Sequence, residues 1–170
     1  MRPIRCQICG ETYIGRDIPD RCPYCGVDGG YMVEAAEYVD YDDMDVCEKS
    51  EKFLRRGIEL EMSNVAYYEC AADNAQSEVA RVLFKRIGKH EGEHLELFCD
   101  TLGIEEPEIE PEDCSGEDRE HMANGKDRED RATKLYMQFA KEAPEPRIKQ
   151  IFSAIAGIEQ EHYRLFNSYG

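Results

Sequence analysis

No segment of this 170-residue chain is apolar for long enough to cross a lipid bilayer, and its first residues, MRPIRCQICGE, lack the apolar core of a secretion signal. Basic residues are also scarce, because 21 Lys and Arg accompany 37 Asp and Glu and leave a formal net charge of −16. An acidic surface repels nucleic acids and anionic membranes, so we expect neither as a partner. We therefore expect a soluble cytoplasmic protein.

The eight cysteines do not indicate a disulfide framework. Four of them follow the pattern C-x2-C-x12-C-x2-C, which is typical of a tetrathiolate metal site; they are Cys6, Cys9, Cys22 and Cys25. Iron and zinc fit this spacing equally well. The remaining four have no ligand spacing, and we expect them to be unpaired thiols in a reducing compartment; they are Cys47, Cys70, Cys99 and Cys114.

A triplet of metal-ligating residues occurs twice in the chain with unchanged spacing. Glu61, Glu91 and His94 recur 68 positions later as Glu129, Glu159 and His162. The same offset relates several apolar and glycine positions, so the repeat covers a whole helical hairpin; these pairs include Gly57 and Gly125, Tyr68 and Tyr136, Phe84 and Phe152, and Phe98 and Phe166. A pair of metal ions with twofold ligation would require such a duplication.

The apolar frame of the repeat predicts that the carboxylates point into the protein. Tyr68 and Ala72 lie 7 and 11 positions after Glu61, which is the spacing of one buried helix face. Buried carboxylates are costly without a compensating cation. Residues three apart share a helix face, so each Glu-x-x-His pair can offer one oxygen and one nitrogen. Four Glu and two His converging in this way indicate a site for two metal ions.

A zinc protease is the alternative that this region raises. His90, Glu91 and His94 also fit the pattern H-E-x-x-H, in which two His hold zinc and the Glu acts as a general base. The second copy carries Ile158 at the position of His90, so the duplication preserves Glu-x-x-His and not the protease pattern.

The chain divides into a small module, a linker and a larger helical domain. We expect a metal-stapled module of strands and loops at 1–35, with a minimal core of Tyr13, Tyr24 and Tyr31. An acidic linker at 36–45 follows, and a four-helix bundle occupies 46–170. The segment 103–116 can extend about 45 Å at roughly 3.3 Å per residue, which is enough to cross the length of the bundle between the second and third helices.

Local signals predict the ends of the helices. Asp45 and Glu48 resemble a capping pair that opens the first helix, which ends near Asn74. Ser77 caps the second helix, which ends near Gly103. The third helix begins after Ser115, with Asp118 in the capping box, and ends before Pro144, and Pro146 lies in the first turn of the fourth.

With these motifs established, the chain resembles the rubrerythrin family in its reverse arrangement, in which a rubredoxin-like module precedes a ferritin-like bundle. The resemblance rests on CQICG, CPYCG, EGEH and EQEH, together with Glu61, Tyr68, Glu129 and Tyr136. It implies that Glu91 and Glu159 bridge two irons. Glu61 with His94 would complete one iron and Glu129 with His162 the other, and Tyr68 and Tyr136 would support the ligands from outside.

The resemblance implies a peroxidase that reduces hydrogen peroxide to water at the di-iron centre, while the tetrathiolate iron relays single electrons to it. A redox donor such as a rubredoxin or its reductase would supply the electrons. The family usually carries a further Glu three residues after the first ligand of the second hairpin, whereas this chain has Asn64 and Ala132 at the two matching positions. This departure leaves oxygen reduction open as an alternative to peroxide reduction.

Two other functions fit the same ligands. An iron-oxidising storage protein would assemble a cage of many subunits, and a metal or redox sensor would not turn over with an electron donor. We expect a homodimer in which the acidic linker lets the small module reach the bundle of the neighbouring subunit, so that electrons cross between subunits.

Overall fold

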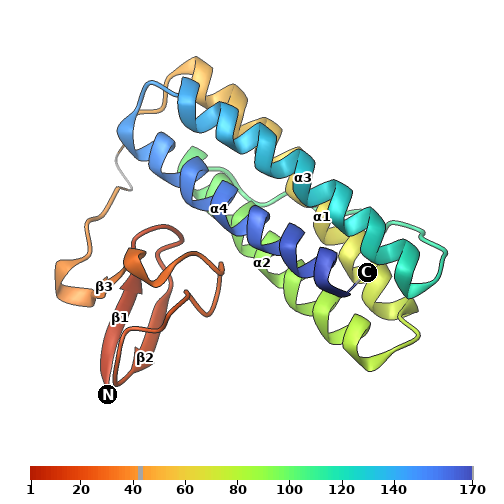
Figure 1. Cartoon of the computed structure of the whole chain (residues 1–170). Coiled ribbons are helices and arrows are strands. Elements are labelled where there is room, and N and C mark those ends of the chain that lie inside the picture. The colour runs from red at the N-terminus through yellow and green to blue at the C-terminus, as the bar shows by residue number, and fades with distance from the viewer. Residues whose placement is uncertain (42–43, 170) are drawn as a thin grey trace.

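The computed structural model describes residues 1–41 and 44–169, so Asp42 and Asp43 of the expected linker and Gly170 of the expected bundle range lie outside the described residues. The described chain begins with three short strands and continues into long helices (Figure 1). The expected fold class is confirmed: the protein is mainly helical, with a small strand module at the N-terminus. None of the described helices is long and apolar enough to cross a membrane.

The larger domain is built from two antiparallel helical hairpins. Helices α1 (Glu48–Asn74) and α2 (Glu78–Leu102) form the first, and α3 (Asp118–Glu142) and α4 (Pro146–Tyr169) form the second. Each hairpin is joined by a turn of three residues, which forces neighbouring helices to run antiparallel. The four helices enclose one elongated interior into which the buried Glu and His side chains of the repeat point.

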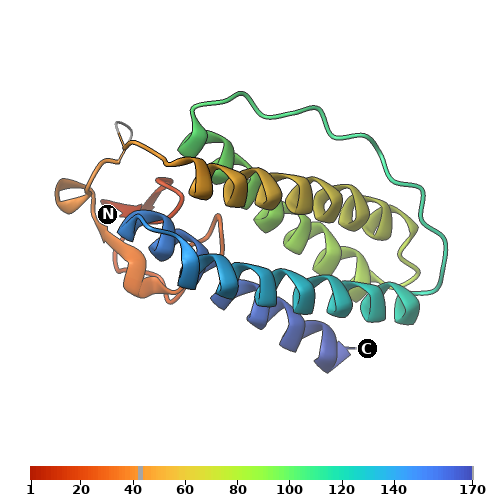
Figure 2. The same cartoon turned by 90° about the horizontal axis from the view of Figure 1, so that it is seen from above.

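A long crossover joins the two hairpins. The chain leaves α2 at Gly103, whose positive φ of 63° ends the helix in a left-handed turn, and it begins α3 at Asp118. Figure 2 shows this segment running along the outside of the bundle from one end to the other. The crossover expected from the length of the segment is confirmed, and it aligns the two copies of the repeat side by side.

Two glycines allow the helices of this bundle to approach each other. A Cβ atom on Gly57 would lie 2.8 Å from the ring of Phe98, and a Cβ atom on Gly125 would lie 2.8 Å from the ring of Phe166. These distances are too short for any side chain, so glycine is required at both positions. Because the two pairs are related by the offset of 68, the packing follows the same internal twofold repeat as the ligands.

The predicted helix ends agree with the structure where the signal is local. The Ser77 hydroxyl accepts a hydrogen bond from the Ala80 N–H at 3.1 Å, and Pro146 opens α4. Two predicted caps are wrong. Asp118 is the first residue of α3 rather than part of its box: Glu117 and Glu120 form the capping box, while Asp118 accepts hydrogen bonds from the turn before α2.

The predicted start of α1 is also wrong. Asp45 does not cap the helix, which begins after Cys47 without a capping bond from its own N-cap side chain. Instead, the carboxylate of Glu145, just before α4, accepts hydrogen bonds from the Cys47 N–H at 2.8 Å and from the Ser50 hydroxyl. The cap therefore comes from a residue almost one hundred positions away, which no local pattern can indicate.

The N-terminal module is a three-stranded antiparallel sheet in the order β2-β1-β3. Strands β1 (Arg2–Cys6), β2 (Thr12–Gly15) and β3 (Met32–Glu34) are joined by the cysteine-bearing loops. The expected tyrosine core is wrong, because Tyr13, Tyr24 and Tyr31 are only partly buried at its edge. The buried apolar side chains besides the cysteines are aliphatic and thioether groups: Ile4, Ile8, Val27 and Met32.

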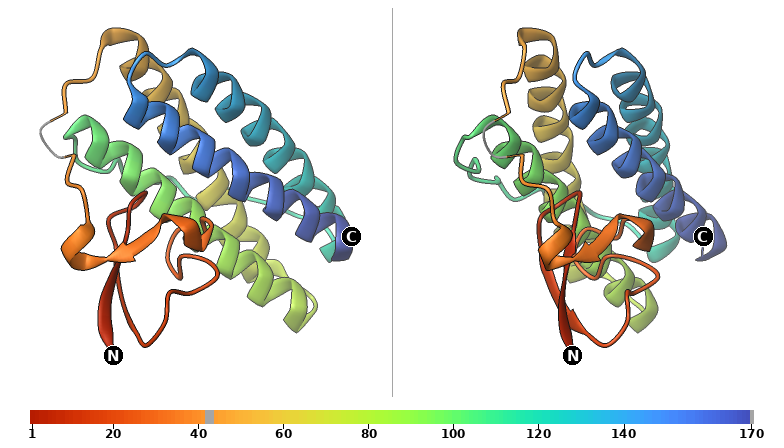
Figure 3. Two further views of the ribbon diagram at one scale, coloured as in Figure 1. Left: turned by 60° about the vertical axis from the view of Figure 1, so that its left-hand side comes forward. Right: turned by 90° about the vertical axis from the view of Figure 1, so that its left-hand side faces the viewer.

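The module packs on its own bundle, beside α2 and α4 (Figure 3). Arg147 of α4 donates hydrogen bonds to the carbonyl oxygens of Gln7 at 2.5 Å and Ile8 at 3.0 Å. Arg86 of α2 donates to the carbonyl oxygen of Pro23. Apolar side chains of the module and the bundle form one continuous buried cluster. The described chain thus places the module on its own bundle, whereas the expected homodimer and the transfer of electrons between subunits stay predictions.

The crossover is attached to α1 by a disulfide bond between Cys70 and Cys114. The expectation that both are unpaired thiols is wrong. Their 44-residue separation hides the pairing in the sequence, and the path of the crossover along the bundle brings Cys114 beside the end of α1. Cys47 and Cys99 remain free cysteines, the first exposed and the second buried.

Candidate metal centres

The four cysteines of the N-terminal motif converge between two loops of the module. Cys6 Sγ lies 3.9 Å from Cys25 Sγ, Cys9 Sγ lies 3.8 Å from Cys22 Sγ, and all four sulfur atoms lie within 4.8 Å of one another. Each loop bends at a glycine after its second cysteine, and Gly10 and Gly26 have φ values of 80° and 77°. These turns fold each pair of sulfurs toward the other pair.

The ionisation of these thiols favours a metal ligand set. Hydrogen bonds from the thiols of Cys25, Cys6 and Cys9 lower the pKa of Cys22, and the bond to Cys22 raises the pKa of Cys9 and of Cys25. The four thiols therefore differ in how readily they ionise. A bound divalent or trivalent cation would compensate four thiolates together, as tetrahedral sulfur sites require.

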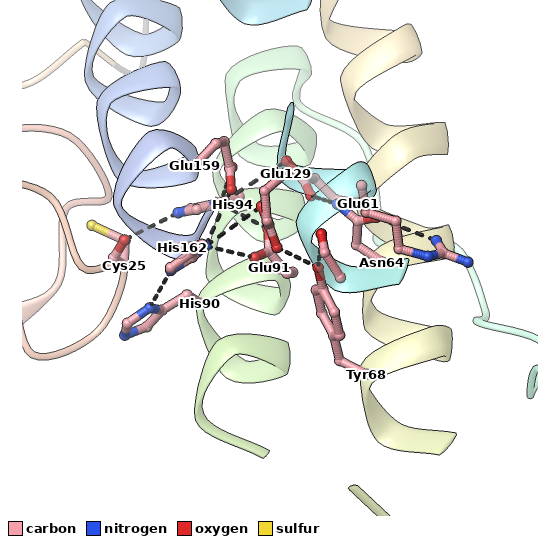
Figure 4. A network of polar contacts seen from close by, with 12 residues as sticks. Cys25, Glu61, Asn64, Tyr68, His90, Glu91, His94, Glu129, Glu159 and His162 are labelled. Atoms are coloured by element: carbon pink, nitrogen blue, oxygen red, sulfur yellow. Dashed lines mark hydrogen bonds and ion pairs between the residues drawn. The ribbon is translucent and has the colours of Figure 1, made fainter. Parts of the chain in front are cut away.

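The second centre lies in the middle of the bundle, where all six residues of the repeated triplet converge (Figure 4). Each helix contributes: α1 gives Glu61, α2 gives Glu91 and His94, α3 gives Glu129, and α4 gives Glu159 and His162. They form two overlapping groups whose ligand atoms lie within 4.8 Å of one another, one containing Glu61 and His94 and the other containing Glu129 and His162. Glu91 and Glu159 belong to both groups.

The distances show how the two groups share their carboxylates. His94 Nδ1 lies 3.3 Å from Glu91 Oε2 and 3.1 Å from Glu159 Oε1. His162 Nδ1 lies 3.1 Å from Glu91 Oε1 and 3.2 Å from Glu159 Oε2. Each imidazole thus presents its Nδ1 atom to both shared carboxylates. The bridging roles of Glu91 and Glu159 stay predictions, and this placement is what two bridged metal ions would need.

Burial makes this set of residues unstable without a cation. Five of the six side chains have no exposed surface, and His162 is 3% exposed. Burial and then repulsion from Glu91 raise the pKa of Glu61 and of Glu129 well above the ordinary carboxyl value. Burial opposes a charge on His94, but the carboxylates of Glu159 and Glu91 together outweigh burial and raise the pKa of that imidazole.

Several of these buried atoms lie 3.1 to 3.7 Å from a charged neighbour but make no hydrogen bond of acceptable geometry among the described residues: both oxygens of Glu91, Glu159 Oε1, Glu129 Oε2 and His94 Nδ1. Buried polar atoms without partners are rare in proteins and usually mark an ion, a water molecule or a catalytic role. Their convergence on one point, with oxygen and imidazole donors, fits a pair of metal ions.

Two tyrosines hold the outer carboxylates across the repeat. The Tyr136 hydroxyl donates to Glu61 Oε1 at 2.5 Å, and the Tyr68 hydroxyl donates to Glu129 Oε1. Each tyrosine therefore supports the carboxylate of the other hairpin. Burial and the adjacent carboxylates raise the pKa of both phenols well above their ordinary value, so both remain protonated donors.

The outer nitrogen of each buried histidine contacts a residue that the sequence did not assign to the site. His94 Nε2 lies 3.0 Å from the carbonyl oxygen of Cys25, and His162 Nε2 lies 3.0 Å from His90 Nδ1. A hydrogen bond at the outer nitrogen fixes the orientation of a ligating imidazole. The contact of His90 with His162 could not be seen in the H-E-x-x-H pattern, because that pattern suggests a zinc ligand at His90.

The fold and these two clusters define a four-helix bundle protein with a paired carboxylate and histidine centre and an appended tetrathiolate module. The chain is similar to reverse rubrerythrin-1 of Clostridium acetobutylicum, with 30% identity over 115 residues. The match covers 61% of this chain and 63% of that relative. No family model matches the chain. No solved structure matches it either.

The order of the two parts matches the reverse arrangement of that relative's family: the four-cysteine cluster comes first and the helical bundle second. The resemblance stated from the motifs is therefore confirmed. The boundaries at 35 and 45 between module, linker and bundle stay predictions, as do the individual roles of the site residues.

Proposed function

We propose that this protein is a non-haem di-iron peroxidase that reduces hydrogen peroxide to water and receives electrons through its tetrathiolate iron. The observation that carries the proposal is the hydrogen-bond contact between His94 of the paired centre and the backbone of Cys25 in the thiolate cluster. An iron store has no need of a one-electron centre at this position. The similarity to a reverse rubrerythrin supports the same class of oxidoreductase.

The chain supplies ligands, orientation and exclusion of water. Glu61 and His94 would hold one iron, Glu129 and His162 the other, and Glu91 and Glu159 would bridge them. When bound, the iron pair would supply Lewis acidity and two electrons for cleavage of the O–O bond, and the thiolate iron would return electrons singly. The balanced reaction consumes one peroxide, two electrons and two protons and yields two waters.

The residues around the centre orient its outer carboxylates and surround it with apolar side chains. The hydroxyls of Tyr68 and Tyr136 donate hydrogen bonds to the outer carboxylates, which fixes the orientation of these carboxylates toward the centre. The apolar layer beyond them includes Phe84, Phe98 and Phe152, all with no exposed surface. Such a dry environment strengthens every electrostatic interaction at the centre.

Oxygen reduction is the second candidate, and Asn64 and Ala132 favour it. Neither position provides the additional carboxylate that the rubrerythrin family usually carries beside the irons. The two candidates share their ligands and their electron relay and differ in the oxidant that reacts fastest with the reduced protein.

The test combines metal analysis with anaerobic stopped-flow reaction of the fully reduced protein against peroxide and against oxygen. We expect iron in both centres and a second-order rate constant for peroxide that exceeds that for oxygen. Sustained peroxide turnover with a reduced rubredoxin and its reductase should follow. A faster reaction with oxygen would replace the proposal with oxygen reduction, and iron uptake far beyond three ions per chain would replace it with storage.

A further inference from the structure

The internal repeat is broken beside Glu61. The residue three positions after Glu61 is Asn64, whereas the matching residue after Glu129 is Ala132. The residue before Glu129 is Arg128, whereas the matching residue before Glu61 is Leu60. One side of the paired centre therefore carries two polar residues where the other side carries two apolar ones.

The two polar residues form a chain of hydrogen bonds that ends on a ligand of the candidate metal centre. Asn64 is 2% exposed, and its Nδ2 atom lies 3.2 Å from Glu61 Oε2. Arg128 Nη1 donates to Asn64 Oδ1 at 3.4 Å. Because arginine can only donate, this contact requires the amide oxygen of Asn64 to face Arg128 and its NH2 group to face Glu61.

Arg128 is itself fixed from three directions. Its Nη2 atom lies 3.2 and 3.3 Å from the two carboxylate oxygens of Glu112 in the crossover. Its Nη1 atom donates to the hydroxyl and the carbonyl oxygen of Ser63 on α1. Its guanidinium lies over the ring of Tyr67, 4.2 Å from the ring centre. A side chain held by these contacts can hold Asn64 in one orientation.

The two outer carboxylates consequently differ in their hydrogen bonds. Glu61 accepts from Tyr136 at one oxygen and from Asn64 at the other. Glu129 accepts from Tyr68 at Oε1, and its Oε2 has no hydrogen-bond partner among the described residues. Glu61 is fixed at both oxygens, whereas Glu129 keeps one oxygen fully available to a metal ion.

We propose that Asn64, held by Arg128, is a positioning residue that fixes Glu61 and makes the two metal positions of the paired centre inequivalent. A donor on Glu61 Oε2 prevents the carboxylate from turning and so holds its oxygens in one orientation toward the metal position. Glu129 has no such constraint. The inference rests on the di-iron centre proposed above.

The experiment compares the intact protein with Asn64→Ala, which installs the residue of the matching position in the second hairpin. Mössbauer spectra of the anaerobic reduced protein, loaded with ⁵⁷Fe, report the surroundings of each iron. Stepwise titration with Co²⁺ reports the two affinities separately. Arg131→Gln is the matched control: Arg131 lines a surface cavity of about 400 Å³ together with Asn64 and Arg128, but it donates its hydrogen bond to the carbonyl oxygen of Asp127.

We expect two distinct iron signals of equal area in the intact protein, besides that of the thiolate iron. In Asn64→Ala, one of the two signals should shift, and the affinity of one position should fall by about 10- to 100-fold, as is usual when a supporting hydrogen bond is lost. Arg128→Gln should change the same signal to a smaller extent, and Arg131→Gln should change neither. Circular dichroism and thermal unfolding of each metal-free variant establish that the bundle is folded.

Two outcomes separate this inference from the proposed function. Failure of the intact protein to bind a pair of irons would overturn the di-iron proposal itself. Two equivalent irons in the intact protein, or identical spectra and affinities in the intact protein and Asn64→Ala, would overturn this inference and leave the di-iron proposal standing. An equal change at both positions would assign Asn64 a general structural role and would also overturn it.

Discussion

The Nε2 atom of His94 lies 3.0 Å from the carbonyl oxygen of Cys25. One hydrogen bond therefore joins the candidate di-iron ligand set to the candidate thiolate cluster within a single chain. The contact depends on docking of the module against α2 and α4, where Arg86 and Arg147 bind its backbone carbonyls. This contact supports a path within one chain for the electron relay that the proposed function requires.

This path predicts the result of a subunit-mixing experiment. Subunits with Cys9→Ser lack the thiolate iron, and subunits with Glu91→Ala lack the di-iron centre. If the protein is a homodimer, mixed dimers of the two inactive forms should show no recovery of donor-driven peroxide turnover, because neither chain contains both centres. Exchange must be verified by native mass spectrometry. Recovered turnover in proven mixed dimers would instead support transfer between subunits, which is the outcome that the acidic linker predicts.

A second prediction separates the roles of the two centres. Cys9→Ser combined with Cys25→Ser should remove the thiolate iron and abolish multiple turnover, while the prereduced di-iron centre should still react once with peroxide. The reason is that the substitutions leave all six ligands of the bundle in place. The comparison variant is Cys47→Ser, an exposed free cysteine outside both clusters, which should turn over normally. Donor-driven turnover in the double variant would refute the relay.

The disulfide between Cys70 and Cys114 should stabilise the bundle under oxidising conditions. It closes a loop across 44 positions, and loop-closure entropy at this length corresponds to about 4 kcal/mol. We expect dithiothreitol to lower the free energy of unfolding of the intact protein by about 2–4 kcal/mol. Denaturation of Cys114→Ser should respond little to the reductant. Equal stability of the oxidised and reduced intact protein would show that the bond contributes nothing.

The cap of α1 predicts that the free energy of unfolding depends on pH. Burial raises the pKa of Glu145, but hydrogen bonds from the Ser50 hydroxyl and the Cys47 N–H outweigh it and lower that pKa from 4.5 to about 2. A lowered folded-state pKa contributes stability above pH 4.5, and this contribution is lost as the pH falls from 4.5 toward 2. Glu145→Gln should therefore cost about 1 kcal/mol at pH 7 and reduce the loss of stability in acid.

Urea denaturation at several pH values would measure this effect. Glu69→Gln serves as the control, because Glu69 is exposed on α1, the helix that Glu145 caps, and does not itself cap a helix. The interpretation of Glu145 as a cap would fail if both variants had the same stability at pH 7 and the same slope in acid.

The sequence was sufficient for features that repeat or that depend on near neighbours. The two ligand triplets could be found because the offset of 68 preserves both the ligands and the apolar frame around them. The Ser77 cap could be found because donor and acceptor lie three residues apart. The thiolate cluster could be found because each pair of cysteines shares a tight turn.

Features that depend on contact between distant segments could not be predicted. Glu145 caps α1, and Cys114 forms a disulfide with Cys70, only when the two hairpins and the crossover have folded against each other. In the sequence, Asn64 only marks a position where the family usually has a carboxylate. Its orientation toward Glu61 depends on Arg128 of α3, which reaches it only in the folded bundle. His90 was obscured by a motif of a different protein class.

The most direct test of the account is the iron content of the anaerobically loaded protein, compared with that of Glu91→Ala and Glu159→Ala. We predict three irons per chain in the intact protein and one in either variant, since each substitution removes a shared carboxylate between the two histidines while the thiolate cluster remains. Glu161→Ala, on α4 but outside the cluster, should retain three. Circular dichroism should show a folded bundle in every variant. Two irons still bound in the bundle of Glu91→Ala and Glu159→Ala would contradict the assignment of the paired centre.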